Sequence, residues 1–134
     1  MRHLFWIFAL SLTWGFSTRA AVPTTPALKP GSICESLVLR LPNVKAPLCL
    51  NANLQATQGK SVQGRTIFAS DIAGSQPQLR VLVIGGIHGD EKSSGSVVLH
   101  WIQHASDTPS NAQWRFIPLA NPDGLNAKPP RRVN

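Results

Sequence analysis

The segment that decides the fold is Val81-Leu82-Val83-Ile84-Gly85-Gly86-Ile87-His88-Gly89-Asp90-Glu91, in which an apolar run ends abruptly at two glycines. Residues 81–84 are continuous and mostly β-branched, which predicts a strand buried on both faces. Strands of this kind occur where helices cover a sheet. The segment therefore favours an α/β fold.

A helix and a further strand are predicted on the C-terminal side. Asp90 is a candidate N-cap, and apolar residues follow at positions 98, 101, 102 and 105, which lie on one face of a helix. The apolar run 114–119 predicts the next strand, and Pro118 indicates either an edge position or a break in that strand. The order strand, helix, strand predicts a right-handed crossover.

On the N-terminal side, the sequence predicts a short helix and another strand. Apolar residues recur at helical spacing over 33–41 and stop before Pro42. Residues 64–69 have the pattern of a strand, and residues 74–77 that of a turn.

Composition limits the class of protein. The chain has 134 residues, of which 43% are hydrophobic, with 11 prolines and 10 glycines. These values are typical of one small globular domain. The longest apolar stretch, Leu4–Phe16, is too short to span a membrane as a helix. Two cysteines are too few for a disulfide-built mini-protein.

Residues 1–20 are predicted to be a secretory signal peptide. Arg2 and His3 precede the apolar stretch, and small residues around Ala20 suit a cleavage point. An uncleaved anchor is the alternative. We expect a secreted or periplasmic protein with no stable membrane anchor after cleavage.

The positive charge does not indicate a nucleic-acid partner. The formal net charge is +7, and the basic residues are scattered singly except for Arg131 and Arg132. A nucleic-acid interface would require a basic stripe or patch.

Cys34 and Cys49 are predicted to form a disulfide, because an exported chain meets an oxidising compartment. Closing a loop of about 15 residues contributes roughly 3 kcal/mol in the chain-entropy model. A zinc pair is the weaker alternative, since no second Cys or His lies near either residue.

His88 and Glu91 are the candidate metal ligands. Their spacing of three places both side chains on one face of a helical turn, at the carboxyl end of a strand. Imidazole and carboxylate suit zinc, and a catalytic site with two His and one Glu needs one more His. The alternative is that the acidic residues Asp90 and Glu91 only stabilise the start of a helix. His100 and His104 have no companion carboxylate and are expected to be solvated.

Four segments together resemble the zinc carboxypeptidases of the carboxypeptidase A type, including the bacterial murein-peptide-amidase-like branch. Gly59–Arg65 resembles the family's G-x-S-x-x-G-R segment, and residues 81–91 resemble its metal-binding strand and loop. Asn121-Pro122-Asp123-Gly124 resembles its N-P-D-G turn, and Arg132-Val133-Asn134 resembles its R-x-N motif. The resemblance covers about residues 55–134.

The resemblance implies a fold and roles for individual residues. The fold would be the incomplete N-terminal part of a mixed, mostly parallel sheet flanked by helices. His88 and Glu91 would be two ligands of one zinc ion, and Arg132 would polarise the scissile carbonyl, a role that Arg131 could take instead. Residues 121–124 would form a structural turn. Zinc hydrolysis of a peptide or amide bond would be the reaction.

The resemblance also implies that parts of the site are absent. The third zinc ligand, a His, and the catalytic Glu would both follow residue 134. We therefore expect a signal peptide (1–20), an N-terminal segment (21–54) and a truncated catalytic domain (55–134). Its substrate would be a peptide with a free C-terminal carboxylate, such as a murein peptide. The chain alone is expected to bind zinc weakly and to hydrolyse nothing.

Two other functions stay open at this point. Zinc deacylases of N-acyl amino acids, the desuccinylase and aspartoacylase group, share a G-x-H-G-x-E loop, but residues 121–124, residues 59–65 and the export signal speak against them. A non-catalytic secreted module is the other alternative.

Overall fold

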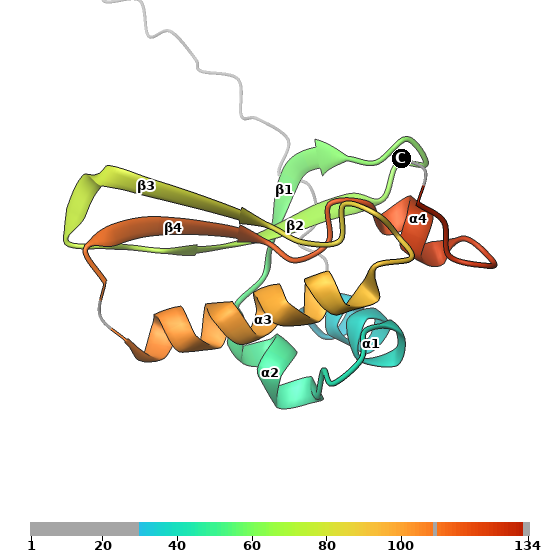
Figure 1. The fold of residues 1–134 in the computed structure, drawn as a ribbon, viewed down its shortest axis with the longest axis horizontal. Coiled ribbons are helices and arrows are strands. Elements are labelled where there is room, and N and C mark those ends of the chain that lie inside the picture. The colour runs from blue at the N-terminus through green and yellow to red at the C-terminus, as the bar shows by residue number, and fades with distance from the viewer. Residues whose placement is uncertain (1–29, 109, 133–134) are drawn as a thin grey trace, which may run out of the picture.

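The computed structural model describes residues 30–108 and 110–132, so the predicted signal peptide and its cleavage point lie outside it. Figure 1 shows the elements found within these ranges. In chain order they are α1 (Pro30–Arg40), α2 (Ala46–Asn51), β1 (Gln55–Lys60), β2 (Thr66–Ile72), β3 (Gln76–Ile84), α3 (Lys92–Asp107), β4 (Ala112–Ile117) and α4 (Pro122–Asn126). None of the described helices is long and apolar enough to cross a membrane.

The four described strands form one mixed sheet in the order β1-β2-β4-β3. β3 and β4 are parallel and are joined through α3, because a parallel pair needs a crossover. The pairs β1–β2 and β2–β4 are antiparallel. The expected mixed α/β class is confirmed, although parallel pairs are not in the majority among these strands.

Helices α1, α2 and α3 pack on one face of the sheet (Figure 1). The core between the layers contains Phe116 of β4, Leu99 and Ile102 of α3, and Leu37 of α1, all of which are almost fully buried. A disulfide between Cys34 and Cys49 links α1 to α2. The apolar periodicity of α1 and α3 thus explains how both helices attach to the sheet.

The expectation that residues 81–84 are buried on both faces is wrong for the described structure. Val83 packs against the core, whereas Leu82 is 56% exposed and Ile84 is 43% exposed. The reason is that the described helices cover one face only and β3 lies at the edge of the sheet. A continuous apolar run therefore leaves one apolar row facing solvent.

The N-cap expected at Asp90 is wrong, and of the two alternatives for Pro118 the break in the strand is confirmed. α3 begins at Lys92 with Glu91 at the N-cap position, so Asp90 is not the cap. β4 ends at Ile117, directly before Pro118, and it lies between β2 and β3. Pro118 therefore ends a central strand and does not mark an edge, because proline cannot donate a ladder hydrogen bond.

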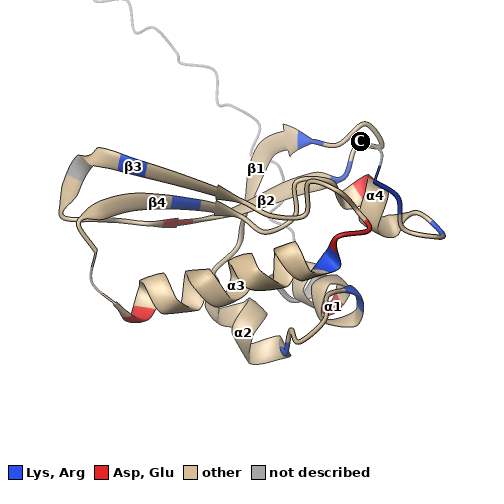
Figure 2. Cartoon of the chain, viewed as in Figure 1, with Lys and Arg blue, Asp and Glu red and all other residues tan. Residues whose placement is uncertain are grey.

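Charged residues are spread over the strands, loops and helices (Figure 2). Lys and Arg occur singly along β1, β3 and β4 and do not form a stripe on one element. On the strands, Arg115 of β4 pairs with Asp71 of β2. The basic residues of the strands are thus scattered in the fold, as they are along the sequence.

Candidate metal centre

The loops that follow β3 and β4 continue side by side beyond the strands. The N–H of Ala120 donates to the Gly85 carbonyl at 3.0 Å, and the N–H of Asn121 donates to the Gly86 carbonyl at 2.8 Å. Gly86 has a φ of +57°, a left-handed conformation that glycine adopts without strain. The parallel pairing thus carries the loop 85–91 alongside α4.

Gly89 and Gly124 bring these two segments into direct backbone contact. A Cβ atom added at Gly89 would lie 1.9 Å from the carbonyl carbon of Gly124. No side chain larger than hydrogen fits at this point. The close approach fixes the position of the neighbouring His88 relative to α4.

His88 and Glu91 lie side by side, as their spacing predicts. The Nδ1 atom of His88 is 3.2 Å from Oε2 of Glu91, and the side chains are 31% and 49% exposed. The N–H of Glu91 also donates to the His88 carbonyl at 3.2 Å. A hydrogen bond thus holds the backbone of the pair, and both side chains are partly exposed, although the Nδ1 atom itself is buried.

The donor atoms of this pair fit a metal ion. The Nδ1 atom of His88 is buried and has no hydrogen-bond partner among the described residues. A buried ring nitrogen of this kind requires a partner. Two ligands of a tetrahedral zinc, each about 2.1 Å from the ion, lie about 3.4 Å apart. The observed 3.2 Å between Nδ1 and Oε2 is close to that separation.

A third ligand is not present in the described part of the chain. Within residues 30–108 and 110–132, no group of three His, Cys, Asp or Glu side chains could hold a metal ion. His100 and His104 lie further along α3 and are exposed, as expected, and Nε2 of His100 lies 3.3 Å from the Asn43 carbonyl. His88 and Glu91 are therefore a candidate for part of a metal site, and we call these two residues the half-site.

Arg132 lies next to the half-site. Its Nη2 atom is 3.3 Å from Oε1 of Glu91, and the side chain is largely exposed. Arg131 contributes backbone contacts: its N–H donates to the Gly124 carbonyl and its carbonyl accepts from the Gly89 N–H, both at 2.9 Å. Of the two arginines, Arg132 is the one whose guanidinium reaches Glu91. Val133 and Asn134 lie outside the described residues.

Residues 121–124 form the start of α4, which is a short helix and not an isolated turn. The side chain of Asn121 caps this helix by accepting from the N–H of Gly124 at 2.7 Å. Pro122 occupies the first helical turn, where its missing N–H costs nothing. The N-P-D-G sequence thus encodes a helix start that is packed against the loop of His88.

Asp123 holds α4 to the loop between β1 and β2. Its carboxylate accepts from Ser61 Oγ at 2.8 Å, from Gln63 N–H at 2.9 Å and from Arg65 Nη1 at 2.6 Å. Partial burial alone would raise the pKa of Asp123, but these three donors outweigh it and hold the pKa below its ordinary value. Sequence reasoning assigned Asp123 to a turn and did not find these contacts.

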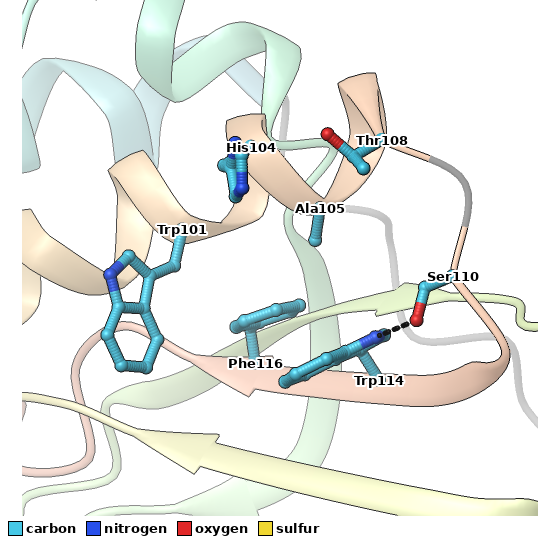
Figure 3. A pocket seen from close by; sticks show the side chains of 7 residues that line it. All are labelled: Trp101, His104, Ala105, Thr108, Ser110, Trp114 and Phe116. Atoms are coloured by element: carbon cyan, nitrogen blue, oxygen red, sulfur yellow. Dashed lines mark hydrogen bonds between the residues drawn. The ribbon is translucent and has the colours of Figure 1, made fainter.

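A separate pocket lies at the other end of α3 (Figure 3). It has a volume of about 390 Å³, and the rings of Trp114 and Phe116 stack along it with centroids 5.6 Å apart. Trp114 Nε1 donates to Ser110 Oγ at 2.9 Å. His104 lines this pocket, but no carboxylate does, so the pocket lacks the donors of a metal centre.

Comparison with known protein families identifies the family of this chain. The family model described as zinc carboxypeptidase matches residues 53–129, a range that includes His88 and Glu91 and ends before Arg131. No curated protein sequence matches the chain significantly.

Among solved structures, carboxypeptidase A from Helicoverpa armigera matches with a TM-score of 0.50 and 25% sequence identity. The match covers 75% of this chain and 26% of that chain, so the present chain spans about a quarter of its length. The family match extends over more than half of the sequence and agrees with the observed fold. The chain belongs to the zinc carboxypeptidase family.

Proposed function

We propose that the chain supplies part of the active site of a metallocarboxypeptidase, with His88 and Glu91 as two ligands of one zinc ion. The observation that carries the proposal is the buried Nδ1 atom of His88, which forms no hydrogen bond within the described residues and lies 3.2 Å from the Glu91 carboxylate. When bound, zinc polarises a carbonyl and lowers the pKa of a bound water, which serves hydrolysis of a peptide bond at the C-terminus.

Arg132 supports this reaction with its own chemistry. Its guanidinium stays charged near neutral pH and lies beside Glu91, where it attracts the carbonyl oxygen or the terminal carboxylate of a peptide. The substrate class is therefore a peptide with a free C-terminal carboxylate. We infer murein peptides as members of that class and a secreted or periplasmic location, both from the resemblance and the predicted signal peptide.

The isolated chain is proposed to be catalytically inactive. Its described residues contain no group of three side chains that could hold a metal ion, and it spans about a quarter of the related carboxypeptidase A. The exposed apolar side chains of β3, Leu82 and Ile84, indicate a sheet face that further protein would cover. Two ligands are expected to bind zinc weakly.

A zinc titration by calorimetry tests the half-site. The wild-type chain is expected to bind one zinc ion, and His88→Ala to lower the affinity at least about tenfold, since removing a ligand costs more than removing one of its supporting groups. His100→Ala is the matched control, because His100 is an exposed histidine on α3 and is expected to leave the affinity unchanged. Equal losses in both variants would contradict the assignment.

A hydrolysis assay tests the reaction class. C-terminally free peptides and N-succinylated amino acids are offered in parallel to the isolated chain and to a longer protein that includes it. We expect the longer protein to act on the peptides and the isolated chain to act on neither. Turnover by the isolated chain would overturn its proposed inactivity, and preference for the acylated amino acids would favour the deacylase alternative.

A further inference from the structure

The Asp123 carboxylate connects two segments that are about sixty residues apart in sequence. Oδ1 accepts from Ser61 Oγ at 2.8 Å and from Arg65 Nη1 at 2.6 Å, and Oδ2 accepts from the Gln63 N–H at 2.9 Å. All three donors belong to the loop between β1 and β2. The Asp123 side chain is only 15% exposed, so these charge-assisted bonds are partly shielded from water.

The loop that supplies the donors is itself closed by hydrogen bonds. The N–H of Ser61 donates to the Arg65 carbonyl at 2.9 Å, and the N–H of Arg65 donates to Ser61 Oγ at 3.0 Å. Gly64 N–H donates to the Ser61 carbonyl at 2.9 Å. Asp123 therefore binds a preorganised set of donors and not a row of independent side chains.

The residue after Asp123 transmits this anchoring to the half-site. The Gly124 carbonyl accepts from the Arg131 N–H, and the Arg131 carbonyl accepts from the Gly89 N–H, both at 2.9 Å. Gly89 and Gly124 are also in backbone contact. A shift of α4 would thus move both the Arg131–Arg132 backbone and the loop that carries His88.

We infer that Asp123 is a positioning residue for the half-site: it fixes α4 on the loop between β1 and β2, and α4 in turn sets Arg132 opposite Glu91 and holds the loop of His88. Asp123 contacts neither the metal ligands nor Arg132 directly, so its effect passes through Gly124 and Arg131. The expected effect on zinc binding rests on the proposed function. The link from Asp123 to the half-site rests on the hydrogen bonds of the described residues.

The sheet offers a matched control in the pair of Asp71 and Arg115. Arg115 donates to both carboxylate oxygens of Asp71 at 2.7 Å, so this pair is also an Asp–Arg contact between distant segments. It joins β2 to β4, and both side chains are more than half exposed. None of its described contacts reaches the loop 85–91. The effect of losing any Asp–Arg pair can thus be separated from the effect of losing the contacts of Asp123.

The test compares Asp123→Asn with Asp71→Asn in the whole chain by zinc titration and by amide hydrogen exchange measured by NMR. Asp123→Asn is expected to lower zinc affinity by up to about tenfold, less than the loss of a group bonded directly to a ligand, because Asp123 acts through Gly124 and Arg131. It is also expected to speed exchange of the Gly89 and Arg131 amides. Asp71→Asn is expected to change neither quantity.

Ser61→Ala removes one of the three donors and is expected to act in the same direction more weakly. It replaces Asp123→Asn in the test if that variant does not fold.

Two results would overturn the inference. One is wild-type exchange at Gly89 and Arg131 in Asp123→Asn, or in Ser61→Ala where that variant replaces it. The other is an equal effect of Asp71→Asn on the same amides. If the wild-type chain binds no zinc at all, the proposed function fails, while the exchange measurement still decides whether Asp123 holds these backbones. The two failures are therefore distinguishable.

Discussion

The guanidinium of Arg132 lies 3.3 Å from Oε1 of Glu91, while His88 Nδ1 lies 3.2 Å from the other oxygen of the same carboxylate. Glu91 therefore stands between a fixed cation and the nitrogen that is expected to bind zinc. A guanidinium and a divalent cation repel each other and compete for one carboxylate. This arrangement makes the two neighbours of Glu91 act on metal binding in opposite directions.

Replacing Arg132 with glutamine is expected to strengthen zinc binding by about twofold to fivefold. This is the size of effect expected when one exposed charge interaction is lost. The cause is removal of the competing cation beside Glu91. Calorimetric titration measures the change. Lys128→Gln is the control for net charge, since Lys128 is an exposed lysine near α4 and is expected to leave the affinity unchanged. Weaker binding in Arg132→Gln would show that Arg132 does not compete for Glu91.

Local pattern predicted α1, α3, β2, β3 and β4 but not α2 or β1, and the contacts that build the site are long-range. The β-branched run 81–84 and the apolar spacing of α3 were sufficient for a strand and a helix, because both depend on neighbouring residues. The burial of Leu82 was predicted wrongly, because burial of a sheet face depends on which other elements of the chain pack against it. The link from Asp123 to Ser61 could not be predicted, because it joins segments with no local signal of contact.

Alanine at Gly89 is expected to abolish zinc binding and to destabilise the fold. Its Cβ would lie 1.9 Å from the Gly124 carbonyl carbon, so one backbone must move and carry His88 with it. Gly74→Ala is the matched control, because an added Cβ there would also meet backbone, 2.1 Å from the Ala112 carbonyl oxygen, but at the turn between β2 and β3. It is expected to destabilise the fold and to leave the zinc affinity unchanged. Chemical denaturation and zinc titration of both variants give the comparison, and retained zinc affinity in Gly89→Ala would contradict it.

Removal of the disulfide is expected to lower stability without changing metal binding. Cys34 and Cys49 are separated by 15 residues, and closing a loop of about that length contributes roughly 3 kcal/mol through the unfolded state. The bridge joins α1 to α2, neither of which carries a residue of the half-site. Urea denaturation of the double Cys→Ala variant measures the first effect and zinc titration the second. A stability unchanged by the substitution would show that the bridge does not form in the protein.

Stability is expected to fall in acid because two carboxyl groups have lowered pKa values. Hydrogen bonding by Arg115 lowers the pKa of Asp71, and the donors around Asp123 lower its pKa against the effect of burial. A lowered folded-state pKa gives stabilisation that is complete above the ordinary value of 3.8 and is lost as the pH falls through the folded value. Urea denaturation at pH 7, 5 and 3 measures the loss. The double variant Asp71→Asn with Asp123→Asn is expected to lose less between pH 5 and pH 3 than the wild type, and an equal loss would contradict the assignment.

The exposed row on β3 is expected to drive self-association of the isolated chain. Leu82 and Ile84 are 56% and 43% exposed on a strand at the edge of the described sheet, and an apolar edge is prone to pair with another chain. Leu82→Lys places a charge in that row without removing a core side chain, because Val83 and not Leu82 packs against the core. Light scattering is expected to show a lower apparent mass and less aggregation for Leu82→Lys.

Val62→Lys is the control, since Val62 is an exposed apolar residue in the loop between β1 and β2. If Val62→Lys reduces association as strongly as Leu82→Lys, added charge is the cause, and β3 is not the surface that associates.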